Sequence, residues 1–319
     1  MPVPSAPDRR LILHADDYGM NPSVNSGILK AFREGLLTST SLLVNSPDTA
    51  AACAEWPKLI QELESGALPS LGLRQSAGDE RIPFDLGIHL NLTQGRPLTK
   101  DYPDELLDHQ GRFPGIGSVF RRLLSPESKF RDKVRAELEL QFTTMISLGV
   151  RPSHINGHQY IELIPGISEL IPSLADQFQV RVVRLALEPH LTRTLFPELR
   201  LTTWGLSLVK QFYARRFRGQ LAGKSLVAPQ QFFGTSHAGL VTLRTLRKFL
   251  SYPSRGQWTE VGLHPAVEGC QHTPQVSDGW NDPLAAHRPQ ELAWLCASKT
   301  VDLLNSQGFK LGRLSSMHQ

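Results

Sequence analysis

The chain has 319 residues, of which 40% are hydrophobic and 20% charged, with 34 Lys and Arg against 30 Asp and Glu. This composition excludes a disordered chain and suits one large α/β domain or two small ones. The net charge of +4 comes from one segment, because residues 199–259 contain ten basic residues and no acidic one. The rest of the chain is net negative, so a nucleic-acid-binding protein is not expected.

Cysteine content and hydropathy point to a soluble protein of a reducing compartment. The three cysteines are widely spaced and form no CxxC pair, which disfavours a disulfide framework and a structural zinc knuckle. The N-terminal stretch has no apolar run between its prolines and its first charges, so no signal peptide is expected. No stretch approaches the ~18 apolar residues of a membrane span. We expect a cytoplasmic location, with peripheral contact at the inner membrane surface left open.

Strand and helix signals alternate along the chain. A branched apolar run at 10–15 predicts a first strand, which the DDYG turn ends, and a helix capped by Ser23 follows it as far as Gly35. Further strands are predicted at 37–45, 85–92, 153–157, 180–185 and 259–263, before a final segment at 308–314. Further helices are predicted at 47–59, 129–148, 165–178 and 289–304. This alternation predicts a parallel sheet or an α/β barrel, with function at the C-terminal ends of the strands.

Ionisable side chains lie at or just past the predicted ends of four strands. They are Asp16, Asp17, His89, His158 and His264. A catalytic metal site uses three His or carboxylate ligands and leaves a position open for water, whose proton a nearby carboxylate can accept. Asp17, His89 and His158 would meet that count, and Asp16 would be the free carboxylate. We therefore expect a metal site where these strand ends meet.

The segment SHINGHQ leaves one ligand question open. On a helix, His154 and His158 would share a face, as in a metal-binding helix. Gly157 and Pro152 favour a strand and a loop instead, on which His154, Asn156 and His158 alternate onto one side. This spacing does not decide whether His154 is a metal ligand, a partner of a ligand or a core residue.

Four linked motifs resemble those of the YdjC-like carbohydrate deacetylases, a family that includes chitooligosaccharide and hopanoid-biosynthesis deacetylases. The motifs are HADDYG, LGIHLNLTQGRPL, RPSHINGHQ and VGLHPA, and the resemblance extends from Leu11 to Leu314. It implies an α/β fold, a distorted (β/α) TIM-like barrel, as a single deacetylase domain over residues 1–319. It also implies hydrolytic removal of the acetyl group from an N-acetylhexosamine, dependent on a divalent metal ion such as zinc or magnesium.

The resemblance also assigns roles to the five candidate residues. Matched by motif, Asp17, His89 and His158 are the metal ligands, Asp16 is the general base and His264 is a general acid. These roles suit the chemistry, because an acetamide is a poor electrophile whose nitrogen departs only when protonated. His264 is expected to supply that proton as an imidazolium.

Substrate contacts are expected from Arg184, Asn156 and Tyr160. Many relatives carry histidines where this chain has Tyr160 and Glu162, and the NGHQ wording is closer to the hopanoid-associated branch than to the chitooligosaccharide branch. The expected partner is thus an N-acetylated sugar or a glycolipid, with a hopanoid lipid favoured over soluble chitooligosaccharides. A barrel isomerase or aldolase with the same metal set, and a non-catalytic sugar- or lipid-binding relative, are the alternatives.

The basic segment 199–259 predicts an insertion or cap at about 190–256, near the rim that carries the site. Basic residues lie beside apolar residues with helical spacing, namely Leu201, Trp204, Leu208, Val209, Phe212 and Tyr213. Such a helix either packs its apolar side on the core or lies on anionic lipid. Ser236 and His237 indicate at most a substrate loop, because no GxSxG elbow is present. A homodimer is left open.

Overall fold

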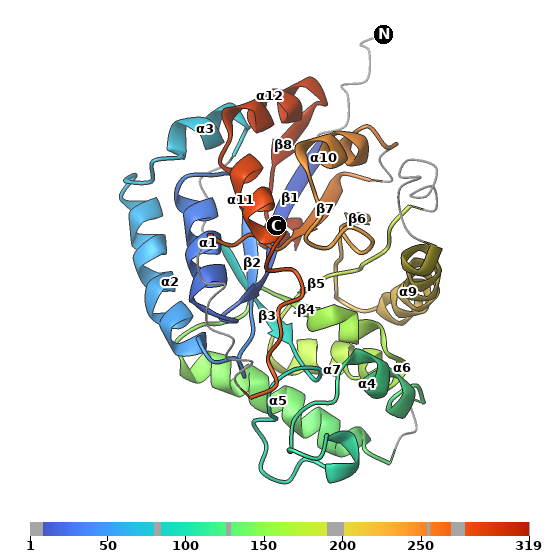
Figure 1. The fold of residues 1–319 in the computed structure, drawn as a ribbon. Coiled ribbons are helices and arrows are strands. Elements are labelled where there is room, and N and C mark those ends of the chain that lie inside the picture. The colour runs from blue at the N-terminus through green and yellow to red at the C-terminus, as the bar shows by residue number, and fades with distance from the viewer. Residues whose placement is uncertain are drawn as a thin grey trace.

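The computed structural model describes residues 9–79, 84–125, 129–189, 201–253, 256–268 and 278–318. In this part of the chain, eight strands form one parallel sheet in the order β5-β4-β3-β2-β1-β7-β6, with β8 also paired to β1 (Figure 1). They are β1 (Arg9–Tyr18), β2 (Ser39–Leu42), β3 (Asp85–Leu90), β4 (His154–Gly157), β5 (Val182–Val183), β6 (Gln231–Phe233), β7 (Trp258–Leu263) and β8 (Phe309–Leu311). Each predicted strand overlaps an observed one. The three-residue β6 was not predicted, and it lies within the segment predicted to be an insertion, 190–256.

The sheet curls into a distorted barrel around β1. One edge of β1 pairs with β7, while the other pairs with β8 at its start and with β2 at its end. At the far side, Val182 of β5 bridges to Val227, which precedes β6, and the Phe232 N–H donates to the Leu187 carbonyl at 3.4 Å. These bonds join β5 to β6 and confirm the predicted distorted α/β barrel.

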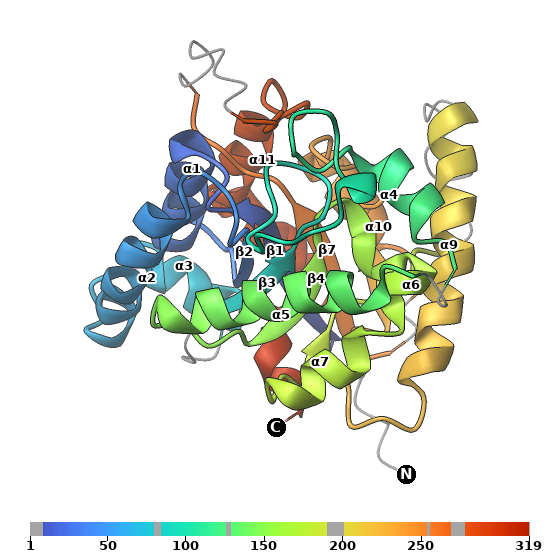
Figure 2. The same ribbon diagram turned by 90° about the horizontal axis from the view of Figure 1, so that it is seen from below.

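Helices cover the outside of the sheet (Figures 1 and 2). The described α-helices are α1 (Pro22–Arg33), α2 (Thr49–Glu64), α3 (Leu71–Ser76), α4 (Ile116–Arg122), α5 (Arg131–Ser147), α6 (Pro165–Ser168), α7 (Ile171–Gln177), α9 (Leu201–Leu221), α10 (Leu243–Leu250), α11 (Arg288–Leu295) and α12 (Ser298–Ser306). Short 3₁₀ helices are η1 (Asp104–Leu106), η2 (His158–Leu163) and η3 (Leu314–His318). The predicted helix at 165–178 is two helices, because Pro172 fits only a first turn and lies in the first turn of α7, which begins at Ile171.

The cap predicted for the first helix is wrong. Asn21 is the N-cap of α1, and its side chain accepts from the Val24 N–H at 3.0 Å, with Pro22 in the first turn. Ser23 lies inside the helix and donates instead to the Val267 carbonyl at 2.6 Å. A proline in the first turn has no N–H to satisfy, so the cap lies just before it.

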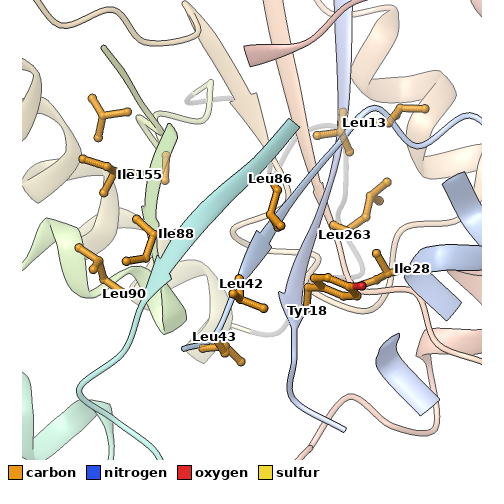
Figure 3. Close-up of a cluster of buried hydrophobic side chains, with 14 of the residues drawn as sticks. Leu13, Tyr18, Ile28, Leu42, Leu43, Leu86, Ile88, Leu90, Ile155 and Leu263 are labelled. Carbon is orange, nitrogen blue, oxygen red and sulfur yellow. The ribbon is translucent and has the colours of Figure 1, made fainter. Parts of the chain in front are cut away.

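Strand alternation separates an apolar layer from a polar barrel interior. Leu13, Leu86, Ile88, Ile155 and Leu263 belong to the large core cluster between sheet and helices (Figure 3). The alternate positions on the same strands carry buried polar groups, namely His14, Asp16, His89, His154, Asn156 and Glu260. Below them, a small cluster of Ile12, Val182 and Leu314 closes the barrel. The barrel interior is therefore polar around the buried ionisable residues and apolar at its closed end.

The segment predicted as an insertion, 190–256, includes elements that contact the barrel. Residues 190–200 and the side chains of 201–204, which include Leu201 and Trp204, lie outside the described residues. Strand β6 pairs with β7, and α10 packs against α12, so both elements are part of the barrel wall. The part that lies beside the sheet is α9, which packs on α6 and η2 (Figure 2).

Candidate metal and catalytic site

Three side chains converge where β1, β3 and β4 end. Asp17 Oδ1 lies 3.0 Å from His158 Nδ1 and 3.4 Å from His89 Nε2. All three residues are buried, and one ligand atom from each lies within 4.8 Å of the others. A carboxylate and two imidazoles form a donor set that divalent transition metals accept. The residues thus fit the metal site that the sequence predicts.

The outward atoms of His89 and Asp17 have partners that orient them. His89 Nδ1 is 2.8 Å from Asn156 Oδ1, which leaves Nε2 facing the cluster. Arg288 donates to Asp17 Oδ2 at 2.7 Å and to Asp282 at 2.8 Å. Burial by itself would raise the pKa of Asp17, but Arg288 and the two imidazoles outweigh it and hold that pKa well below its usual range. Asp17 is therefore ionised before any cation arrives.

Left-handed backbone places the two ligands at the ends of their strands. Asp17 has a φ of 71°, and the two residues after His158, Gln159 and Tyr160, have φ values of 57° and 65°. Non-glycine residues adopt this region at a cost, and such residues cluster at functional sites. Here the turns redirect the chain immediately at Asp17 and immediately after His158.

Asp16 lies next to the cluster and is held by two donors. Asn156 Nδ2 donates to Oδ1 at 3.0 Å, and Arg184 Nη1 donates to Oδ2 at 2.7 Å. Burial would raise the pKa of Asp16, but the charges of Arg184 and His89 lower it overall. Asp16 is thus an ionised carboxylate beside the ligands, as its predicted role as base requires.

Arg184 and Asn156, which the sequence predicts as substrate contacts, are both fully buried beside the candidate ligands. Arg184 spans Asp16 and Glu260, donating to Glu260 Oε1 at 2.8 Å. Asn156 joins the ligand His89 to Asp16. Their observed contacts orient the ionisable groups of the site.

His264 lies just past β7, with Nε2 3.9 Å from Asp16 Oδ2. Its backbone N–H donates to Glu291 Oε2 at 2.5 Å, which fixes the turn after the strand. Burial lowers the pKa of His264 to about 4. The free site therefore holds a neutral imidazole at neutral pH, and the imidazolium expected from the sequence is not its resting form.

The remaining candidate histidine lies deeper in the barrel than the ligand cluster. His154 lies under the site, with its ring 4.8 Å from that of His14, and burial lowers its pKa to about 3. It does not belong to the ligand cluster. An added Cβ at Gly87 would stand 2.3 Å from His154 Nε2, so this glycine leaves room for the imidazole. His154 is thus a residue of the barrel interior.

Tyr160 is the partly exposed member of the predicted substrate-binding set. Its ring lies 4.4 Å below Lys210 Nζ of α9, beside the turn that follows His158. Trp280, which was not predicted from the sequence, is a further aromatic neighbour of the site, with its ring 6.4 Å from that of His158. Ser236 donates to Glu188 Oε2 at 3.0 Å, which anchors its loop to the barrel.

Arg288, Glu260 and Glu291 were also missed by the sequence reasoning. Their roles depend on contacts with residues far along the chain, such as the pair of Arg288 with Asp17. A charged residue in the middle of the buried strand TEVGL was the one available signal, and it marks Glu260.

The fold is a parallel α/β barrel, and an Asp-His-His cluster with a second carboxylate lies at the ends of its strands. These features define the class as an α/β-barrel protein with a candidate divalent-metal site. The chain belongs to the YdjC-like protein family, whose pattern matches residues 10–306. This match covers every site residue named above.

Curated relatives carry the name carbohydrate deacetylase. The chain is 30% identical to one from Clostridium beijerinckii, which aligns over 54% of this chain and 59% of the relative. It is 34% identical to one from Homo sapiens, over 58% of this chain and 50% of the relative. The alignments thus span only about half to six tenths of these relatives.

The fold also matches a solved structure over nearly the whole chain. A protein of Enterococcus faecalis described as a cellobiose-phosphate cleavage protein superposes with a TM-score of 0.69. The match covers 98% of this chain and 100% of the other, at 20% identity. At this identity the likeness supports the fold and carries no inference about the substrate.

Proposed function

We propose that this chain is a metal-dependent hydrolase that removes the acetyl group from an N-acetylated sugar. The observation that carries the proposal is the approach of Asp17, His89 and His158 within 4.8 Å, beside the separately held carboxylate of Asp16. Ligands and a free base in one place are what hydrolysis of an unactivated amide needs. The name of the curated relatives supplies the substrate class, and the cleaved bond is an amide C–N bond.

Asp17, His89 and His158 would hold a divalent ion, zinc or magnesium, which supplies Lewis-acid activation of the acetyl carbonyl and the water when bound. Asp16 accepts the proton of the attacking water, because Arg184 keeps its carboxylate ionised. The oxygen of that water bonds to the carbonyl carbon, and the C–N bond breaks in the next step.

His264 completes the proton path. It is neutral at rest, so it must first acquire the proton that it later donates. Asp16 Oδ2 lies 3.9 Å from His264 Nε2, and the proton taken from water can pass between them and on to the departing nitrogen. The products are acetate and the free amino sugar. The low pKa of His264 favours rapid release of the proton.

A glycolipid that carries an N-acetylhexosamine, such as a hopanoid glycolipid, is the substrate that we propose within this class. Two features support this substrate: the NGHQ sequence of the site segment and the exposed apolar side of α9, which packs on η2. A soluble chitooligosaccharide is the second candidate, supported by the polar groups that surround the ligand cluster. We place the reaction in the cytoplasm.

Acetate release tests the proposed function. The enzyme would be assayed on an N-acetylglucosaminyl lipid and on chitobiose, with and without a chelator. We expect acetate from at least one substrate, lost with the chelator and restored by added metal. Sugar conversion without acetate would support an isomerase instead, and binding without turnover of either substrate would support a non-catalytic relative.

A further inference from the structure

The outward side of α9 carries large apolar side chains. Its inward side consists of Ser207, Gln211, Ala214, Phe217 and Leu221, all buried. The opposite side exposes four apolar residues, which we call the α9 apolar face: Leu206 (64% exposed), Leu208 (43%), Val209 (47%) and Phe212 (62%). The sequence pattern left two placements open for Leu208, Val209 and Phe212, against the core or outward, and the structure turns them outward.

No described part of the chain covers this face. Gly205, Val209, Phe212 and Gly219 follow one stripe of the helix, because they are spaced by three, four and seven residues. At Gly205 and Gly219, near the two ends of the stripe, an added Cβ would have no described atom within 4 Å. The α9 apolar face therefore borders open space along the length that the structure describes.

Positive charge lies beyond the C-terminal end of the apolar face. Arg216 lies one turn beyond Phe212 on the same side of the helix and is half exposed, and Arg218 and Lys224 are exposed further along the chain. The carboxylate of Glu169 is 3.4 Å from Arg216. Segment 199–259 contains no Asp or Glu at all. Along the chain from Leu206, the exposed surface of α9 is thus first apolar and then cationic.

We propose that α9 docks this protein peripherally on an anionic lipid bilayer. Leu206, Val209 and Phe212 enter the boundary between headgroups and acyl chains, while Arg216 and the basic residues after it contact lipid phosphates. An amphipathic helix that lies in the interface combines these two features. None of the described helices is long and apolar enough to cross a membrane, so the contact is one of surface attachment.

A second copy of the chain fits this surface less well. Four exposed side chains amount to a patch of a few hundred Å², below the ~800 Å² per partner of a standard interface. Two copies joined through this face would also bring together two segments that carry basic residues and no acidic one. Charge complementarity favours the anionic bilayer.

Docking through α9 would hold the site close to the lipid surface. On this helix, Lys210 lies over the ring of Tyr160, and α9 packs on η2, which begins with the ligand His158. A bilayer on the outer side of α9 is then about one helix diameter, ~10 Å, from the site. This arrangement suits a lipid-linked substrate, but attachment itself does not depend on the proposed deacetylation.

Vesicle co-sedimentation of the full chain tests the proposal. The vesicles are pure phosphatidylcholine or an equal mixture with phosphatidylglycerol, at low and high salt. We expect the protein to pellet with anionic vesicles and less at high salt, because salt screens the basic half. Replacing Val209 and Phe212 together by Ser should weaken binding about tenfold or more, because it removes apolar side chains that enter the bilayer.

The matched control is Leu148→Ser, which removes another exposed leucine (39% exposed) at the end of α5. It should bind vesicles as the unmodified protein does. Equal thermal unfolding of all variants shows that each is folded. Absence of binding to anionic vesicles at low salt would overturn the proposal, as would equal losses in the control and in the Val209 and Phe212 variant. A dimer that this variant disrupts, without vesicle binding, would assign the face to a second copy.

Discussion

Replacing Asp16 by Asn tests the proposed base while changing few atoms. Each oxygen of Asp16 accepts a hydrogen bond, from Arg184 Nη1 or from Asn156 Nδ2. An asparagine offers one oxygen and one NH₂, so one of these donors would face another donor. Asn156 cannot turn its amide to compensate without losing its contact with His89.

The expected loss of activity is large and the loss of stability modest. Removing a general base costs about 100- to 10,000-fold in rate. The buried guanidinium of Arg184 keeps Glu260 as a partner at 2.8 Å, so the structural cost is that of one unsatisfied buried donor, about 1–3 kcal/mol. Asp17, His89 and His158 are unchanged, and the variant should retain its metal.

Acetate release, metal content and thermal unfolding would be measured together for this variant. Asp278→Asn is the control, because it makes the same chemical change at an exposed residue paired with Arg96 on the surface. The control should keep full activity. An Asp16→Asn variant that retains its metal and more than about a tenth of the activity would refute the assignment of Asp16 as base.

Three further predictions concern the ligands, the interior and pH. His158→Ala should lose metal and activity together, and full metal occupancy in this variant would exclude His158 as a ligand. His154→Ala should keep its metal but unfold more easily, by about 2–4 kcal/mol in the free energy of unfolding, because it opens a cavity in the interior. Burial raises the pKa of Glu291 from 4.5 to about 7. Its contribution to stability is therefore complete below pH 4.5 and lost as the pH rises through 7. In the presence of a chelator, the Tm of the unmodified protein should fall as the pH rises from 5 to 8. The Tm of the Glu291→Gln variant should fall less over the same range.

Sequence alone could predict that the three candidate ligands lie together, because a parallel barrel brings the ends of its strands to one edge. Asp17 and His89 lie at or near such ends, and His158 follows another, so their order along the chain was enough to place them together. Sequence could not show that Arg288 binds Asp17, because they are 271 residues apart and meet only through the placement of α11. Contacts between distant elements depend on packing geometry, which local patterns do not contain.

The sequence pattern also did not show how deep in the barrel a side chain lies. Alternation indicates that Asn156 and Arg184 point inward, but the interior has layers, and both residues lie in a layer below the open rim. The same limit applies to α9. Helical spacing separates its faces, while the neighbours η2 and α6 decide which face is buried. Here polar Ser207 and Gln211 face inward and Phe212 faces outward.

The two adjacent carboxylates differ in a way that suits their proposed roles. Burial would raise the pKa of each, and a guanidinium lowers each in turn, but Asp17 ends well below its usual range and Asp16 less far. Arg184 is shared between Asp16 and the buried Glu260, so its charge is not devoted to Asp16 alone. A ligand must be ionised at every working pH, whereas a base that is too acidic transfers protons poorly. Glu260 thus preserves the basicity of Asp16, and Glu260→Gln should reduce the rate while the metal content stays unchanged.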